Sequence, residues 1–331
     1  MTEEGKPGPI PPGTRDVLPD EMRELREIEA ALMAEFGRAG YSEVSTPTIE
    51  YAELLSRGGR RGGPLYRFLD DRGELVALRN DMTVPIARLA AARLGEVDPP
   101  WRLSYLGSSF RTTSPRRADL RESGQAGIEL IGSGDAEGTA EVLTVLDRAL
   151  AGVGVTSAVI CIGDASLWPS LLEESGLGAA EAAVCLDALA GGDLVGLEEY
   201  LGSDALGLGA RGRELVSISR TRGTVDVLTG LGDLDSVAGQ ASAERLGAIA
   251  GALEQVGLDA DVVYDLGMAR DPDYYSGEVY EVYSKRLGRS LGGGGRYDGL
   301  LEQFGVELPA VGFSLGLERL HAALIQGSVA P

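Results

Sequence analysis

Apolar residues near the start of the chain recur with the spacing of a helix. Between residues 20 and 39 they lie three or four positions apart, so that one face of a helix would be apolar. The recurring residues are Leu25, Ile28, Leu32 and Phe36. Gly40 follows and suits a helix C-terminus, so we expect an amphipathic helix over 20–39.

Later segments show the two-residue alternation of strands. Residues 68–78 predict a hairpin with Asp71-Arg-Gly73 at its tip. Further strands are predicted at 43–47, 102–111 and 127–131, and further helices at 81–94 and 136–151. Several consecutive strands with helices packed to one side predict an antiparallel sheet and an α+β fold.

The second half of the chain has a different pattern. Residues 166–256 are almost wholly helical in pattern and rich in Leu, Ala and Gly. Strand-like sequence resumes at 261 and continues to Phe313, and a closing helix is predicted from about Leu315. The expected division is a core formed by 1–165 and 257–331, with 166–256 as a helical insertion. We expect no further domain after the closing helix.

Composition places the chain among globular proteins, with 44% hydrophobic and 24% charged residues. The N-terminus lacks the basic start and apolar segment of a secretion signal, and we expect a cytoplasmic protein without membrane spans. Cys161 and Cys185 lie in apolar surroundings and are expected to be buried, and two cysteines with a single histidine, His321, cannot complete a structural zinc site. We therefore expect no metal and no cofactor, and an ordinary structural role for His321.

The formal net charge of −21 changes the expected partners. Proteins that hold an RNA backbone usually carry a basic face that neutralises phosphates. Because acidic residues outnumber basic ones by 51 to 30 here, we do not expect tRNA binding.

Arginines in strands, carboxylates and paired tyrosines together favour a pocket for a small zwitterion. A planar guanidinium donates two parallel hydrogen bonds to a carboxylate, whereas an ammonium group needs carboxylate or amide oxygens. An imidazole ring pairs with a carboxylate on one nitrogen and a phenol on the other. Taken singly, each such residue is more simply explained as a surface ion pair or a core tyrosine.

Four blocks of sequence towards the C-terminus carry a resemblance to a known family. They are Asp265–Gly277, which contains Arg270-Asp-Pro-Asp-Tyr-Tyr275, then Glu278–Tyr283, Gly292–Gly299 and Pro309–Leu320. In this order they resemble the histidine-binding and third signature motifs of histidyl-tRNA synthetases. The chain is most similar to the non-synthetase relatives of these enzymes, the regulatory subunits of ATP phosphoribosyltransferase. The resemblance implies the antiparallel class II aminoacyl-tRNA synthetase sheet, built as a homodimer.

The resemblance also implies a role for individual residues in binding histidine. Asp81 and Thr83 match the block that holds the amino group, and Gln125 and Glu129 match contacts to the amino group and the imidazole. Arg111 matches the arginine of the second class II motif, and Arg270, Tyr274 and Tyr275 match the histidine-specific Arg-x-x-x-Tyr-Tyr. Since these matches form one ordered series, we predict a histidine-shaped pocket.

Three departures from the synthetase pattern argue against adenylation. The chain stops about a dozen residues after the third motif, where a synthetase has an anticodon-binding domain. Thr113 and Ser123 replace an acidic residue and a phenylalanine that stacks on adenine, a contact of about 1–3 kcal/mol in other nucleobase–aromatic pairs. Asp81-Met-Thr83 replaces Glu-Gly-Thr, a form associated with the regulatory relatives. Arg121 and Arg319 would then remain from an ATP site, and we expect no catalytic residues.

The resemblance thus implies a non-catalytic regulatory subunit in the first step of histidine biosynthesis. Its expected partner is the short form of the ATP phosphoribosyltransferase catalytic subunit, with L-histidine as effector and a homodimer within a larger hetero-oligomer. Two alternatives remain open. One is a truncated histidyl-tRNA synthetase or another amino-acid-activating paralogue, and the other is a histidine-binding or stress-sensing module with a different partner.

Overall fold

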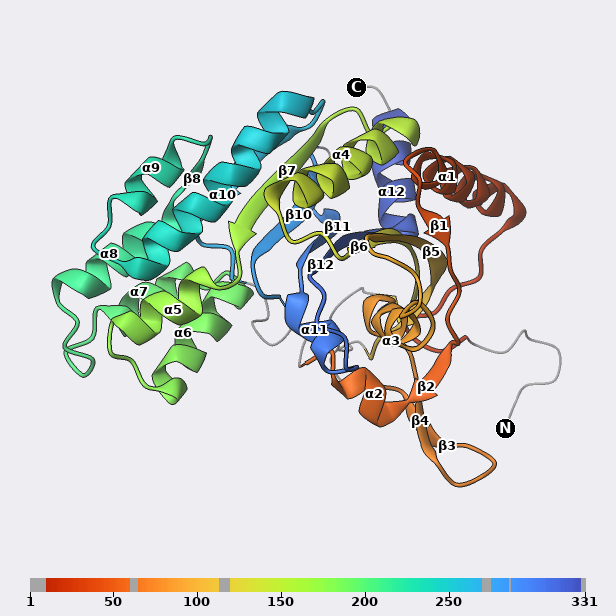
Figure 1. The fold of residues 1–331 in the computed structure, drawn as a ribbon, viewed down its shortest axis with the longest axis horizontal. Coiled ribbons are helices and arrows are strands. Elements are labelled where there is room, and N and C mark those ends of the chain that lie inside the picture. Colours follow the sequence, from red (N-terminus) through yellow and green to blue (C-terminus); the bar gives the residue numbers. More distant parts are fainter. Residues whose placement is uncertain (1–9, 60–64, 113–119, 270–274, 286, 329–331) are drawn as a thin grey trace.

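The computed structural model describes residues 10–59, 65–112, 120–269, 275–285 and 287–328, and a long twisted sheet runs through its centre (Figure 1). Within these residues the sheet has nine strands in the order β1-β5-β6-β12-β11-β10-β7-β9-β8. Their bounds are β1 Ser42–Glu43, β5 Trp101–Phe110, β6 Glu122–Ile131, β7 Ala158–Asp164, β8 Arg222–Gly223, β9 Asp261–Asp265, β10 Glu278–Ser284, β11 Ser290–Arg296 and β12 Ala310–Gly316. A smaller antiparallel sheet has the order β2-β4-β3, with β2 Ile49–Tyr51, β3 Arg67–Leu69 and β4 Leu75–Leu78.

The expected α+β, class II synthetase-like fold is confirmed, with one correction to the sheet. Strands β5, β6, β12, β11, β10 and β7 are antiparallel to their neighbours in this order. The pairs β1–β5 and β7–β9 are parallel, so the sheet is mixed. Parallel neighbours need a long crossover between them, and the chain supplies one in each case. Between β7 and β9 the crossover is the helical segment that follows Asp164.

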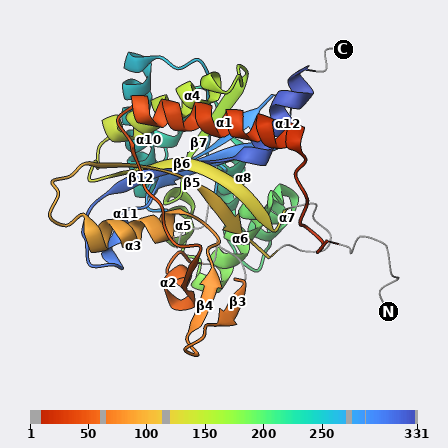
Figure 2. The same ribbon diagram turned by 90° about the vertical axis from the view of Figure 1, so that its right-hand side faces the viewer.

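Helices cover both faces of the large sheet, not one face as expected. Figure 2 shows α1, α4 and α12 above the sheet and α3 and α11 below it. Their bounds are α1 Pro19–Arg38, α3 Thr83–Arg93, α4 Ala136–Gly152, α11 Asp298–Glu302 and α12 Leu317–Ser328, with α2 Ala52–Ser56 against the small sheet. The second layer follows from a separate apolar cluster beneath the sheet, which contains Met82, Ile86 and Tyr105.

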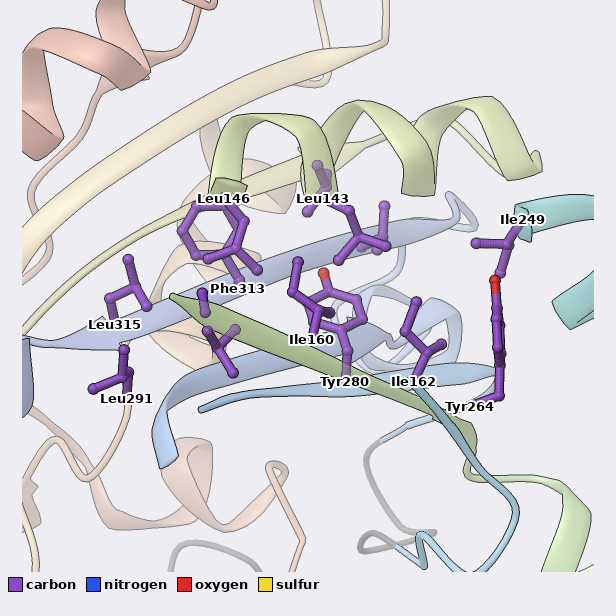
Figure 3. Close-up of a cluster of buried hydrophobic side chains, with 14 of the residues drawn as sticks. Leu143, Leu146, Ile160, Ile162, Ile249, Tyr264, Tyr280, Leu291, Phe313 and Leu315 are labelled. Carbon is purple, nitrogen blue, oxygen red and sulfur yellow. The ribbon is translucent and has the colours of Figure 1, made fainter. Parts of the chain in front are cut away.

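Strand β6 shows how one strand serves the two faces. Ala126, Ile128 and Leu130 are buried in the large core with α1 and α4. Gly127 and Glu129 alternate with them and therefore face the α3 side. Figure 3 shows the large core, in which α4 lies over side chains of β7, β10 and β12, including Ile160, Tyr280 and Phe313.

The segment between β7 and β9 is helical apart from the short strand β8. Its helices are α5 Leu167–Glu174, α6 Ala179–Gly191, α7 Leu194–Leu201, α8 Ala210–Arg220, α9 Val227–Gly232 and α10 Val237–Val256. We call residues 167–256 the helical region; it lies to one side of the sheet in Figure 1. Helix α10 packs against α4, α5 and α9, which joins the region to the core.

The cysteines and the histidine contribute to packing. Cys185 is buried, which raises the pKa of its thiol to about 11, while Cys161 is only partly buried, less than expected. His321 is buried on α12, with Nε2 2.6 Å from Oε2 of Glu24 on α1. In the described part of the chain, no helix is both long and apolar enough to cross a membrane.

Candidate ligand-binding site

A pocket lies on the α3 face of the sheet and brings distant parts of the sequence together. It is partly open to solvent, and its empty volume is about 530 Å³ when the open part is included. Its lining residues are Asp81, Met82, Thr83, Tyr105, Arg111, Gln125, Glu129, Tyr275, Gly293, Gly294, Tyr297, Gly312, Phe313 and Ser314. Strands β5, β6, β11 and β12 and the start of α3 therefore all contribute to one site.

The floor of the pocket is formed by strand positions without side chains. Gly312 on β12 lies beside both Glu129 and Gly295 in the sheet register. A Cβ atom at Gly312 would lie 1.9 Å from Oε2 of Glu129, a distance that no real contact reaches. Glycine at this position therefore leaves the space that the Glu129 carboxyl occupies.

Glu129 is the central polar group of the site. It is 1% exposed, and each carboxyl oxygen accepts one hydrogen bond. Thr83 Oγ1 donates to Oε1 at 2.8 Å, and the Tyr297 hydroxyl donates to Oε2 at 2.5 Å. Burial raises the pKa of Glu129 from 4.5 to about 8, although both hydrogen bonds oppose the increase and the charge of Asp81 adds to it. The pocket thus holds a carboxyl group that gains or loses its proton close to neutral pH.

The start of α3 forms one wall. β4 ends at Leu78, and the following residues lead directly into the helix at Thr83. Asp81 Oδ1 accepts a hydrogen bond from the Val84 amide at 3.1 Å, which fixes this carboxylate at the first turn of the helix. Asp81 and Thr83 are therefore held at the pocket by the local fold and not by each other.

Arginine and tyrosine side chains complete the walls. Arg111 follows β5 and is exposed, and its Nε donates to the Asn80 carbonyl at 3.0 Å. Tyr105 is 1% exposed, and its hydroxyl donates to the Phe313 carbonyl at 3.3 Å. Tyr275 is buried against Gly295, where a Cβ atom would lie 2.9 Å from Cδ1 of the tyrosine ring.

The structure brings together all the predicted histidine-binding residues that it describes. Asp81, Thr83, Arg111, Gln125, Glu129 and Tyr275 all line the pocket. Arg270 and Tyr274 lie outside the described residues, as does Thr113. The histidine-binding roles themselves remain a prediction.

The two arginines predicted to remain from an ATP site do not line this pocket. Nη1 of Arg319 donates to the Ser290 carbonyl at 3.1 Å. Arg121 packs on Gly13, whose carbonyl accepts its amide hydrogen at 2.7 Å. Among the described residues there is also no group of three His, Cys, Asp or Glu side chains that could hold a metal ion.

Sequence reasoning missed three polar side chains of the pocket, Tyr105, Tyr297 and Ser314. Tyr297 lies within the Gly292–Gly299 block, so the family motif indicated that it lies near the site. The motif did not indicate its hydrogen bond to Glu129. Tyr105 and Ser314 both lie beside Gly127 in the sheet register, which no local pattern reveals.

Comparison with known proteins identifies the family. The model of the histidyl-tRNA synthetase family matches residues 13–320. The ATP phosphoribosyltransferase regulatory subunit of Moorella thermoacetica is 40% identical over 325 residues, which is 97% of this chain and 83% of the relative. The chain belongs to the family of ATP phosphoribosyltransferase regulatory subunits. Members of this family are named as regulatory subunits of an enzyme complex, so the expectation of a non-catalytic chain is confirmed.

Solved structures of the regulatory subunit family and of synthetases have the same fold. A crystal structure from Bacillus halodurans, described as an ATP phosphoribosyltransferase regulatory subunit/histidyl-tRNA synthetase, is 30% identical with a TM-score of 0.86. The match covers 96% of this chain and 84% of that one. A histidine–tRNA ligase subunit from Alicyclobacillus acidocaldarius is 32% identical with a TM-score of 0.78, covering 97% and 98% of the two chains.

Proposed function

We propose that this chain activates a short-form ATP phosphoribosyltransferase catalytic subunit and makes it sensitive to inhibition by histidine. The observation that carries the proposal is the buried Glu129 carboxyl, which lines the pocket and is held by Thr83 and Tyr297. A regulatory subunit needs a site for the molecule that it senses. Histidine is the end product of the pathway in which the resemblance places the complex.

The chemistry of the pocket supports histidine as its ligand. Glu129 would pair with one imidazole nitrogen and the Tyr275 hydroxyl with the other. Asp81 and Gln125 offer oxygen atoms to the α-ammonium group at the same pocket. An arginine would donate two parallel hydrogen bonds to the α-carboxylate, and the resemblance gives this role to Arg270.

Inhibition would arise from coupling between this pocket and the active site of the catalytic subunit. Coupling free energies between sites are typically about 1–3 kcal/mol, which corresponds to inhibition from severalfold to about a hundredfold. The coupling is reciprocal, so binding of the catalytic subunit should change the histidine affinity of this chain by the same factor.

The first experiment measures formation of phosphoribosyl-ATP by the catalytic subunit of the same organism. We expect low activity alone, a large increase when this protein is added, and loss of the increase when histidine is added. Size measurements on the mixture should show a homodimer of this chain within a larger hetero-oligomer. No activation would contradict the proposal. Histidine-dependent ATP–pyrophosphate exchange would then test the synthetase-like alternative. The similarity to the Alicyclobacillus acidocaldarius protein, which is named as a histidine–tRNA ligase subunit, is the reason to test it.

Histidine affinity should depend on pH on both sides of neutrality. A free imidazole has a pKa of about 6.5, and Glu129 in the empty pocket has a pKa of about 8. The pair needs one proton between the ring and the carboxyl group. Above about pH 8 both partners have lost their protons, so binding must take one up and affinity falls by up to tenfold per pH unit. Below about pH 6.5 both carry a proton, one must be released, and affinity falls again.

Calorimetric titration from about pH 5.5 to about pH 9 measures this profile. Glu129→Gln is the matched control, because it keeps the size of the side chain but does not titrate. The difference between the two profiles removes the contribution of the α-ammonium group of histidine, which titrates in both. Parallel profiles above pH 8 would show that Glu129 does not share the proton.

A further inference from the structure

Two contacts join the helical region to the ends of the neighbouring strands β9 and β7. Nε1 of Trp168 on α5 donates to the Leu266 carbonyl, just after β9, at 2.8 Å. Arg245 on α10 forms an ion pair with Asp164, the last residue of β7. The second contact is the one that lies near Tyr275.

The contact between Arg245 and Asp164 is built from several bonds. The Asp164 side chain is fully buried, and its Oδ2 accepts from Nη1 of Arg245. Its Oδ1 accepts from the Ser166 amide at 2.9 Å and from the Ser166 hydroxyl at 2.7 Å. Nη1 of Arg245 also lies 3.1 Å from the same hydroxyl. Without Arg245, a buried carboxylate would keep only neutral partners, which is an unfavourable arrangement.

This contact lies directly beside the strand that follows Tyr275. Asp164 is opposite Glu278 in the register of β7 and β10, and the Ala165 amide donates to the Gly277 carbonyl at 2.9 Å. A Cβ atom at Gly277 would lie 3.2 Å from Cδ of Arg296 and 3.7 Å from Cδ of Arg245, so both arginine side chains pass near this glycine. Arg245 thus lies beside the glycine two residues after Tyr275.

The other side of the same segment is held by β11. The Ser276 amide donates to the Arg296 carbonyl at 2.9 Å, and the Tyr275 ring lies over Gly295. The backbone that follows Tyr275 is therefore bonded to β11 on one side and, next to the Asp164–Arg245 pair, to Ala165 on the other. The helical region reaches the second of these contacts through Arg245.

We propose that Arg245 is a positioning residue for the histidine site, through which the helical region sets the affinity of the pocket. The inference rests on the proposed function, because it takes histidine as the ligand. Arg245 acts by fixing Asp164 and thereby the following residue Ala165, whose amide bonds the Gly277 carbonyl, and so the place of the Tyr275 hydroxyl. A change in the helical region, such as contact with a second protein, would alter histidine binding by this route.

Histidine binding by the full chain tests the proposal. Arg245→Ala should weaken binding by roughly threefold to thirtyfold, the range found for residues that act without touching a ligand. Arg245→Lys keeps a cation near Asp164 and should recover part of the loss. The matched control is Arg220→Ala, which removes an exposed ion pair with Glu198 inside the helical region and should leave affinity unchanged. Equal affinities of the Arg245→Ala and Arg220→Ala variants would overturn the proposal.

A double-mutant cycle separates positioning from general loosening of the fold. The effects of Arg245→Ala and Tyr275→Phe should be non-additive, because the first acts through the second. The effects of Arg245→Ala and Thr83→Ala should add, since Thr83 lies on the α3 wall. Additivity in both cycles, or coupling of equal size in both, would show that Arg245 is merely structural.

Hydrogen exchange separates failure of this inference from failure of the proposed function. In the protein without histidine, Arg245→Ala should speed exchange of the amides at 276–279 relative to Arg220→Ala. If the wild-type protein bound no histidine, the proposed function would fail, and the affinity part of this inference with it. Unchanged exchange at 276–279 would overturn the positioning role whatever the ligand is.

Discussion

Replacing Glu129 by alanine should reduce histidine affinity by about tenfold to a hundredfold, because a hydrogen bond to a charged group contributes about 1.5–3 kcal/mol. The variant also leaves the Thr83 and Tyr297 hydroxyls without the carboxyl group that accepts from both. Calorimetry gives the affinity, and inhibition of phosphoribosyl-ATP formation should weaken in parallel. Activation of the catalytic subunit without histidine should persist, since the side chain is buried in the pocket and not at the surface.

Glu129→Gln adds a stability test to this prediction. The pKa of Glu129 rises from 4.5 to about 8 on folding, so the folded state holds the proton more tightly than the unfolded state. The stability that the protonated group contributes is complete below about pH 4.5 and is lost as pH rises through about pH 8. The free energy of unfolding of the wild type should therefore fall relative to Glu129→Gln across this interval. An unchanged difference, together with unchanged histidine affinity in Glu129→Ala, would remove Glu129 from the centre of the site.

Replacing Arg296 by methionine should cause the largest loss of stability that we predict. Arg296 is 7% exposed, and its Nε lies 3.0 Å from Oε1 of the buried Glu278. Its other nitrogens donate to the Ser133 and Asp135 carbonyls and to the Thr139 hydroxyl, which joins β11 to the start of α4. Breaking a buried pair by removing one partner costs about 3–5 kcal/mol, and urea unfolding should show a loss of this size.

Two comparisons make this prediction specific. Lys285→Ala removes an exposed ion pair with Asp261 and should cost less than about 1 kcal/mol. Adding Glu278→Leu to Arg296→Met should recover part of the loss, because the unpaired buried carboxylate is then absent. A loss no larger than that of Lys285→Ala would show that Arg296 does not join these elements.

The local pattern of apolar and polar residues was enough to predict most helices and strands of the core. The predicted helix over 20–39 corresponds to α1, and the hairpin predicted at 68–78 corresponds to β3 and β4. The spacing of apolar residues shows which face of an element is buried, and this spacing distinguishes a helix from a strand. The spacing does not show which strands pair with each other, so the parallel pairings of β1 with β5 and of β7 with β9 were missed. The short helix α11 was also missed, since its five residues are too few to show a period.

The site was predictable as far as its residues lie in recognisable blocks. Asp81, Thr83, Gln125 and Glu129 were nominated because they match motifs of the family, and the fold brings them together at the pocket. Tyr105 could not be nominated, because its place depends on the pairing of β5 with β6. The raised pKa of Glu129 was equally hidden, since it results from burial under segments separated widely in sequence.

The glycine floor limits how this pocket can be altered by mutation. A Cβ atom at Gly293 would lie 2.4 Å from the Tyr280 carbonyl oxygen, and one at Gly294 would lie 1.9 Å from the Gly312 carbonyl oxygen. Backbone atoms of neighbouring strands cannot move aside without breaking the sheet. Substitutions at these floor glycines, whether natural or designed, therefore cannot change which ligand the pocket prefers. A changed preference would have to arise in the walls, at side chains such as Gln125 or Tyr275.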